Sequence, residues 1–340
     1  MVPATSRPAR DKNENGGDQA CLVQEFHGGR KRSCDSTQGR SVPRAISSDT
    51  LSKQINELCQ KGSDICDECC DLMMTADQFR DPNVTSFSQL LFDVARDQVV
   101  VGARDNLYRL SLKGLTRLEK APWMAQPEII QTCQDKGQSE ESCRNYIKVL
   151  LSNGKKLFAC GTSAFTPACT WREMEDINRV TDWVSGVAKC PHSPYANITS
   201  LMTLSGQYFA GSPMDFSGTD SAIIRDLSPS PLRTKHYNAM WLNEPQFVGS
   251  FETDAFVYFV FREGAVEYMN CGKKIYSRIA RVCKNDTGGA IVLKDNWTSF
   301  VKARLNCSLP GDYPFYFDEV QGMCARERKK KLGMNITRLL

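Results

Sequence analysis

The sequence lacks any long apolar run. Its longest wholly apolar stretch, AFVYFVF at residues 255–261, is far shorter than the roughly 18 residues that suggest a membrane-spanning helix. The first residues, MVPATSRPARDKNENGGDQ, are polar and hold no apolar segment of the kind that a secretory signal requires. The sequence therefore predicts neither a membrane span nor a signal peptide.

Histidine is also scarce, and no catalytic arrangement is recognisable. None of the three histidines, His27, His192 and His236, has the nucleophile and carboxylate neighbours that catalysis needs. GTSAF and GSPMD place a serine between small residues but lack the second glycine of a nucleophile elbow. The sequence predicts no enzyme, no cofactor and no small-molecule substrate.

Charge of one sign is not in excess. The net charge of +4 comes from 43 basic and 39 acidic residues, a balance that does not favour nucleic acid as a partner. The basic runs GGRKRS and RERKKKLG are typical of nuclear or polyanion signals, but solvated chain ends explain them better.

Cysteine and glycosylation sequons are, by contrast, abundant. The chain has 15 cysteines. Asn-x-Ser/Thr sequons begin at Asn83, Asn197, Asn285, Asn296, Asn306 and Asn335. Together these features favour an oxidising compartment, because disulfides persist there and sequons are modified there.

The texture of the chain changes near residue 80. Residues 1–80 are rich in polar residues without a sustained period and predict a disordered arm, with one short helix in SDTLSKQINELCQK. From residue 87 onward, short β-rich runs alternate with turns. Strand-ending glycines at Gly102, Gly161 and Gly211 recur about every 50 to 60 residues, and Phe261 continues the period. This period favours an all-β propeller over a β-sandwich.

The second repeat contains a clear hairpin signal. In YIKVLLSNGKKLFAC, Asn153 and Gly154 separate two apolar runs, and both residues tolerate the positive φ of a tight turn. The nearly continuous apolar runs predict a sheet that is covered on both faces.

Two short cysteine spacings predict local disulfides. Cys133 and Cys143 bracket one polar segment, and Cys160 and Cys169 bracket another. Free thiols are the alternative, and zinc is disfavoured because neither pair has Cys-x-x-Cys spacing or a nearby histidine.

A second group of cysteines lies in the N-terminal arm. It comprises Cys59, Cys66, Cys69 and Cys70, in CQKGSDICDECC. Only Cys66 and Cys69 have ligand spacing, so loose disulfides or thiols are favoured over a metal site.

Several blocks of the sequence resemble a known family. FSQLLFDVARDQVVVGARDNLYRLSL, NYIKVLLSNGKKLFACGTSAFTPACTWRE, PLRTKHYNAMWLNEPQFV and SRIARVCKNDTGGAIVLKDNWTSFVKARLNCS are similar to the first half of a semaphorin sema domain. EYMNCGK, RVCKNDTGG and FVKARLNCSLPGDYPFYFDEVQ are most similar to class 5 semaphorins. The resemblance covers residues 86–322, whereas residues 1–80 and the basic tail 323–340 depart from it.

The resemblance implies a seven-bladed propeller, of which this chain holds the first three to four blades. It also implies an extracellular or cell-surface guidance ligand that binds a plexin receptor and dimerises through a complete propeller. The alternatives are a receptor-side sema propeller and a non-functional truncated product retained in the cell for want of a signal.

The resemblance further implies roles for the cysteines. Cys133 pairs with Cys143 and Cys160 with Cys169, while Cys283 and Cys307 have partners beyond this chain. Cys190 and Cys271 then remain to pair with each other.

Surface sites are expected as well. The sequons predict glycosylation at Asn197, Asn285, Asn296 and Asn306 only if an added signal peptide directs the chain into the secretory lumen. Receptor contact is expected in the connections FSGTDSAIIRDL and PLRTKHYNAM, through Asp220, Arg225, Arg233, Lys235 and His236. For Arg225 and Arg233 the alternative is a structural tie to a neighbouring blade.

Overall fold

The regular secondary structure of the described residues consists mainly of β-strands. The structure, a computed structural model, describes residues 20–24 and 77–323, except 204, 229, 269–271, 310–311 and 313–314. Most of the N-terminal arm, the cysteine group 59–70, Cys271 and the tail beyond residue 323 lie outside the described residues.

Four antiparallel sheets follow one another along the chain. The first contains β2 (Gln89–Asp93), β3 (Gln98–Ala103), β4 (Asn106–Ser111) and β5 (Arg117–Pro122). The second contains β6 (Ile147–Ser152), β7 (Lys156–Gly161), β8 (Ala168–Glu173) and β9 (Val180–Ser185). The third contains β10 (Thr199–Met202), β11 (Tyr208–Pro213), β12 (Ser221–Asp226) and β13 (Leu232–Arg233). The fourth contains β14 (Gln246–Glu252), β15 (Phe256–Gly264), β16 (Ile275–Cys283) and β17 (Val301–Leu309).

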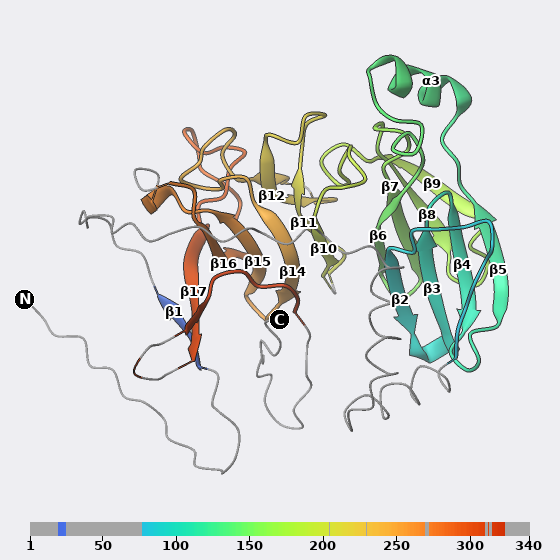
Figure 1. Ribbon diagram of the computed structural model, residues 1–340, viewed down its shortest axis with the longest axis horizontal. Helices are drawn as coiled ribbons and strands as arrows, with labels where there is room; N and C mark the ends of the chain where they lie inside the picture. The colour runs from blue at the N-terminus through green and yellow to red at the C-terminus, as the bar shows by residue number, and fades with distance from the viewer. Residues whose placement is uncertain are drawn as a thin grey trace, which may run out of the picture.

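Each sheet is a meander in which successive strands are hydrogen-bonded neighbours. The first strands contact one another in chain order, β2 with β6, β6 with β10 and β10 with β14. Figure 1 shows the sheets arranged in this sequence, from cyan to red. The prediction of a partial propeller is confirmed, and the sandwich alternative is wrong, because each repeat forms its own sheet.

Alternating side chains bury both faces of the second sheet. On β7, Leu157 and Ala159 pack in a core shared with Val100 of the first sheet. Phe158, one residue along, packs with Tyr208 of the third sheet. Neighbouring side chains of a strand point to opposite faces, so a strand covered on both sides reads as a continuous apolar run.

The strand-ending glycines occupy equivalent places on the second strand of each sheet. A Cβ at Gly102 would lie 2.6 Å from Ile147 of β6, and one at Gly211 would lie 2.5 Å from the Phe247 ring of β14. At Gly161 it would overlap Asn145. These glycines therefore let a neighbouring segment approach the backbone closely.

The predicted hairpin joins β6 to β7, with one difference from expectation. Gly154 has a φ of 85°, but Asn153 is not in the left-handed region. Instead, Asn153 Oδ1 accepts hydrogen bonds from the backbone N–H groups of Lys155 (3.0 Å) and Lys156 (2.7 Å). The asparagine thus acts through its side chain, as in an Asx turn.

Two short strands extend the fourth sheet. β1 (Ala20–Gln24) pairs with Arg304–Ser308 of β17, and β18 (Phe315–Phe317) pairs with Cys307–Leu309. β1 lies in the arm that the sequence predicts to be mostly disordered, so residues 20–24 are an exception within that arm. Its letters, ACLVQ, are mostly apolar, and β17 offers an open edge for pairing.

The helix α3 (Pro127–Asp135) and two 3-10 turns, η1 (Val94–Arg96) and η2 (Val266–Tyr268), complete the described elements. The sequence analysis did not expect α3. Its signals are Pro127 at the first helical position and Glu128 in the first turn, both of which favour a helix start. No helix within the described part of the chain has the length and hydropathy to cross a bilayer.

The long connection between β16 and β17 fills a gap between the third and fourth sheets. Trp297 is fully buried, its Nε1 donates to Ile223 O at 2.8 Å, and its ring stacks on Phe209. Asp286 accepts hydrogen bonds from the backbone N–H groups of Gly288, Thr298 and Ser299. The connection is therefore fixed without regular secondary structure.

Asp286 also has a lowered pKa. Burial opposes ionisation, but the hydrogen bonds from Ser299, Gly288 and Thr298 outweigh it and lower the pKa of the carboxyl group from 3.8 to about 2. Ionised Asp286 consequently stabilises the folded state.

Substitution of Gly211 tests the close approach of the sheets. We expect Gly211→Ala to lower the free energy of unfolding by about 1–3 kcal/mol, because the new methyl group collides with the Phe247 ring. Gly322→Ala is the control, since no heavy atom would lie within 4 Å of its Cβ. Urea unfolding gives both values, and equal stability of the two variants would contradict this packing.

The stability of the folded state should depend on pH through Asp286. The pKa of Asp286 is lower in the folded than in the unfolded state, so its stabilisation is complete well above pH 3.8 and is lost as the pH falls toward 2. Asp286→Asn should cost about 1–3 kcal/mol at pH 7 and clearly less at pH 3. Urea unfolding at both pH values checks this, with Asp254→Asn at the exposed β14–β15 turn as control. A penalty independent of pH would show that the charge contributes nothing.

Candidate functional site

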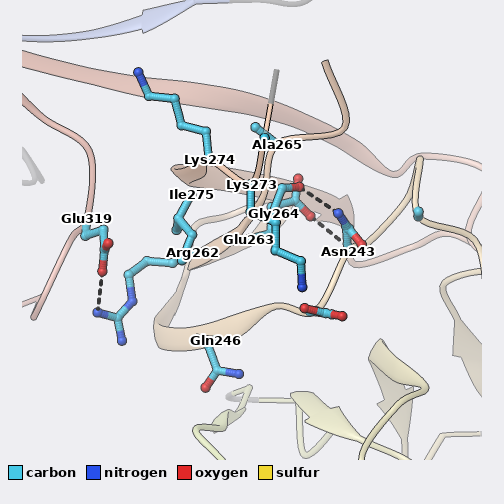
Figure 2. A pocket seen from close by; sticks show the side chains of 13 residues that line it. Asn243, Gln246, Arg262, Glu263, Gly264, Ala265, Lys273, Lys274, Ile275 and Glu319 are labelled. Atoms are coloured by element: carbon cyan, nitrogen blue, oxygen red, sulfur yellow. Dashed lines mark hydrogen bonds and ion pairs between the residues drawn. The ribbon is translucent and has the colours of Figure 1, made fainter. Parts of the chain in front are cut away.

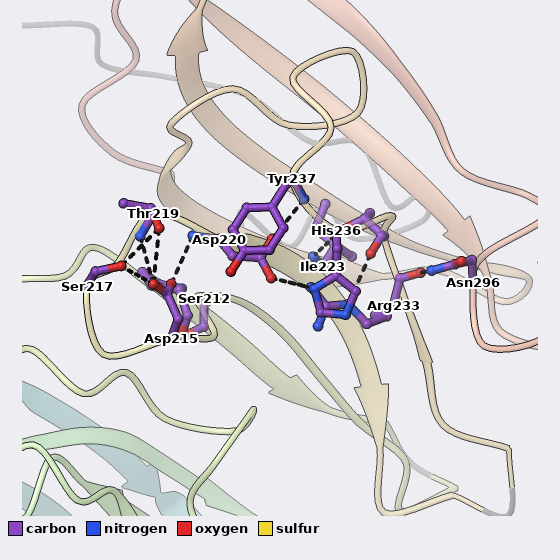
Figure 3. Close-up of polar contacts among 12 residues, drawn as sticks. Ser212, Asp215, Ser217, Thr219, Asp220, Ile223, Arg233, His236, Tyr237 and Asn296 are labelled. Atoms are coloured by element: carbon purple, nitrogen blue, oxygen red, sulfur yellow. Dashed lines mark hydrogen bonds and ion pairs between the residues drawn. The ribbon is translucent and has the colours of Figure 1, made fainter.

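Asp220 is the centre of the expected receptor-contact residues. It lies just before β12, and its side chain is 5% exposed. Its Oδ2 accepts hydrogen bonds from Arg233 Nη2 (2.9 Å) and His236 Nδ1 (2.7 Å), and its Oδ1 accepts one from Tyr237 N (3.2 Å) (Figure 3). Asp220 therefore holds two connections of the third sheet together.

The electrostatics of this centre favour an ionised carboxylate. Partial burial raises the pKa of Asp220, but the hydrogen bonds from Tyr237, Arg233 and His236 outweigh this effect and leave the pKa below its ordinary value. A buried carboxylate with three donors is rigid, and it provides support rather than a surface for contact.

Arg233 is tied down on both its side chain and its backbone. Besides the ion pair with Asp220, its carbonyl accepts hydrogen bonds from Asn296 Nδ2 and Trp297 N, both at 3.1 Å. The structural alternative for Arg233 is therefore the better interpretation, because these bonds join β13 to the connection of the fourth sheet.

Arg225 requires a correction. It is 3% exposed, so it cannot meet a receptor at the surface. Its guanidinium donates to Lys284 O (2.9 Å) and Ser230 O (2.7 Å) and lies 5.4 Å from the Trp297 ring. Burial lowers its pKa. Arg225 is a structural tie between the third and fourth sheets.

Lys235 and His236 are exposed, as a receptor contact would require. The side chain of His236 is 56% exposed, and Lys235 is exposed beside it. Tyr237 and Met240, which the sequence analysis missed, are 77% and 72% exposed. The signal for both was available, as large side chains in the polar connection KHYNAM. We call Lys235, His236, Tyr237 and Met240 the upper loop surface.

The neighbouring connection, residues 214–220, is organised around Asp215. The carboxylate accepts hydrogen bonds from Asp220 N (2.9 Å), Thr219 Oγ1 (3.1 Å) and Ser217 Oγ (Figure 3). Partial burial opposes ionisation, but these bonds lower the pKa of Asp215 to about 2. The loop is therefore internally ordered.

A groove of about 310 Å³ lies beside this loop. Its walls include Gly218 and Thr219 of the loop, Asn197, and Glu244 and Gln246 at the start of β14. Asn197 Nδ2 donates to Gln246 Oε1 at 2.9 Å, so this sequon lies at the wall of the groove.

A larger cavity of about 690 Å³ lies at the same end of the fourth sheet (Figure 2). Its lining has mixed charge, with the cations Arg262, Lys273 and Lys274 and the anions Glu244 and Glu319, and Arg262 Nη1 lies 3.6 Å from Glu319 Oε2. It does not require a ligand to satisfy buried Glu263, which accepts hydrogen bonds from Asn243 N, Arg278 Nε and Lys302 Nζ.

The part of the chain that the structure describes contains no group of His, Cys, Asp or Glu side chains suited to a metal ion. The two histidines within this part of the chain, His192 and His236, both make polar contacts inside the protein. His192 Nδ1 lies 2.8 Å from Phe165 O, and His236 contacts Asp220.

The cysteines divide into pairs and single thiols. Cys133–Cys143 and Cys160–Cys169 are disulfides, with Cα–Cα distances of 5.9 Å and 4.1 Å. Cys283 is a free thiol, whereas Cys307 is disulfide-bonded. The resemblance implies that Cys307 pairs with a cysteine beyond this chain. The disulfide of Cys307 differs from that expectation.

Cys190 also differs from expectation. It is a free thiol, 1% exposed, in the core between the second and third sheets. Burial raises its pKa above the ordinary value. It is not bonded to Cys271, which lies outside the described residues, because surrounding apolar side chains such as Tyr208 and Phe158 enclose it.

The four expected glycosylation residues differ in exposure. Asn197 and Asn285 are exposed. Asn296 is half-buried and donates to Arg233 O, and Asn306 is half-buried within β17. The first two side chains therefore reach the solvent, although Asn197 Nδ2 donates to Gln246 Oε1.

Comparison with known proteins identifies the family. No family model matches the chain. Semaphorin 5c of Drosophila melanogaster is 59% identical over 267 residues, which are 77% of this chain and 24% of that protein. Semaphorin-5A of Mus musculus is 51% identical over 246 residues, 72% of this chain and 23% of that protein. The chain thus spans about a quarter of the length of these relatives.

Solved structures agree with the sequence matches. Drosophila Semaphorin 1b, extracellular domains 1-2, is 40% identical with a TM-score of 0.65, over 71% of this chain and 46% of that one. A chain of Drosophila Plexin A in complex with Semaphorin 1b is 38% identical with a TM-score of 0.66, over 74% of this chain and 48% of that one. The chain therefore belongs to the semaphorin family, as a class 5 semaphorin-like sequence that carries part of a sema domain.

Proposed function

We propose that this chain is a semaphorin-type guidance ligand that binds a plexin receptor in axon guidance and cell migration. The observation that carries the proposal is the match to a chain from the complex of Drosophila Plexin A with Semaphorin 1b. The chain is not an enzyme, because the family to which it belongs consists of signalling ligands. A homodimer through a complete propeller is part of the same proposal.

The upper loop surface is the receptor contact in this proposal. It combines a cation at Lys235, the imidazole of His236 and two large side chains, Tyr237 and Met240. Tyrosine is enriched among the residues that dominate binding energy, and cations steer association with an oppositely charged partner. Asp220 fixes the backbone of Tyr237 beneath this surface, which reduces the entropy lost on binding.

The extracellular or cell-surface location is likewise proposed. The Cys133–Cys143 and Cys160–Cys169 disulfides and the exposed sequons are typical of an oxidising compartment, and semaphorin relatives are similar to most of this chain. The exposed surfaces then face solvent, where a receptor on another cell can reach them.

Charge reversal at Lys235 tests the receptor contact. We expect Lys235→Glu to weaken binding to a plexin ectodomain about tenfold, or about 1.4 kcal/mol, because it removes an exposed cation from the interface. Tyr237→Ala should weaken binding by a similar factor, since it removes a large exposed ring. Biosensor titration of the full chain measures both.

Matched controls lie away from this surface. Lys155→Glu reverses an exposed charge in the β6–β7 hairpin, and Tyr316→Ala removes a ring that is 50% exposed on β18. Both should retain full affinity. If the two upper-loop variants bind as tightly as these controls, the receptor contact lies elsewhere.

Asn197 and Asn285 are the sequons that should carry glycans. We expect high occupancy at both and low occupancy at Asn296 and Asn306, because the first two residues are exposed and the latter two are half-buried. Glycopeptide mass spectrometry of the full chain, directed to the secretory pathway, measures each site. Full occupancy at Asn296 with none at Asn285 would contradict the folded geometry.

A further inference from the structure

Phe216 links two connections that belong to different sheets. It lies in the 214–220 loop of the third sheet and is 39% exposed. Its ring centroid is 5.2 Å from that of Phe165 and 6.2 Å from that of His192. Lys136 Nζ lies 5.5 Å from the same centroid. All three neighbours lie outside the third sheet.

Phe165 ends a turn with an unusual backbone. Ser163, Ala164 and Phe165 have φ values of 41°, 52° and 61°, so three successive residues with side chains occupy the left-handed region. Such conformations are costly and persist only where the surroundings impose them. Here Ala164 N donates to Arg144 O at 3.0 Å, and Ser163 N donates to Asn145 Oδ1 at 3.1 Å.

The surroundings of this turn are a small core of their own. Ala164 and Phe165 pack with Cys133, Cys143 and Ala125, all buried, and with Ile129 and Ile130 of α3. The Cys133–Cys143 disulfide closes the segment that follows α3. α3 and its disulfide therefore pack against Phe165 and hold its ring in place.

The 214–220 loop has few other anchors. Asp215 orders it internally, and Met214 packs against the core at its start. Between Met214 and Asp220, Phe216 is the one large apolar side chain in the sequence MDFSGTD. Its seat against Phe165, His192 and Lys136 is therefore the contact that fixes the middle of the loop.

We propose that Phe216 is a positioning residue through which α3, its disulfide and the left-handed turn fix the 214–220 loop and, through Asp220, the upper loop surface. A segment of the second sheet would then control a surface of the third. Its consequence for receptor affinity rests on the proposed function, whereas the positioning itself does not.

Hydrogen exchange of the full chain tests the positioning directly. In Phe216→Ala, the amides of residues 218–220, which donate to Asp215, should exchange at least about fivefold faster than in the unchanged protein. Phe216→Tyr keeps the ring and should stay within about twofold. Tyr268→Ala, at the same 39% exposure in the β15–β16 connection, should leave these amides unchanged.

A double-mutant cycle with Phe165→Leu sharpens the test. If Phe165 acts through Phe216, the single variant Phe165→Leu accelerates the exchange of residues 218–220. The double variant then exchanges no faster than Phe216→Ala. Additive effects in the double variant would overturn the coupling. The thermal midpoint separates these local effects from general destabilisation, and it should be unchanged in Phe216→Ala.

Plexin affinity of the same variants separates the two proposals. Faster exchange with weaker binding supports both, and faster exchange with unchanged binding upholds the positioning role but overturns the receptor contact. Unchanged exchange in Phe216→Ala overturns the positioning role whatever the affinity.

Discussion

Burial of both faces of each sheet is the constraint on which the rest of this structure depends. A four-stranded sheet is too small to be stable alone, and the second and third sheets each pack both faces against neighbouring sheets. Leu157 and Phe158 on β7 illustrate the result, since adjacent residues enter different cores. At Gly102 and Gly211 the first strand of the next sheet lies so close to the backbone that a side chain would not fit without a shift of its neighbours.

The connections are ordered by a different device. Three carboxylates each accept hydrogen bonds from backbone N–H groups of a connection that they fix, namely Asp215, Asp220 and Asp286. An ionised carboxylate replaces the hydrogen bonds that a helix or strand would otherwise supply, and its lowered pKa keeps it charged at neutral pH. Loops built in this way can present varied side chains outward on a fixed backbone.

Local patterns in the sequence predicted the repeats, the β6–β7 hairpin and the short cysteine pairs, because each depends on residues close together in the chain. Long-range contacts could not be predicted in this way. Arg225 was predicted at the surface, but it is buried. The ring of Trp297, which lies far along the chain, packs against its guanidinium. Nothing in ACLVQ identified the strand that β1 would join. Tyr237 was not predicted at the surface because aromatic residues usually indicate a core, whereas its ring is 77% exposed in the folded connection.

The pairing of β1 with β17 has a consequence for how this chain behaves among copies of itself. An uncovered strand edge is a template on which other chains can add strands, and growth by that route leads to aggregates. Along Arg304–Ser308 the hydrogen-bonding positions are already occupied by Ala20–Gln24. β1, which lies outside the region that resembles a sema domain, thereby occupies this edge. It limits the addition of strands from other copies of the chain.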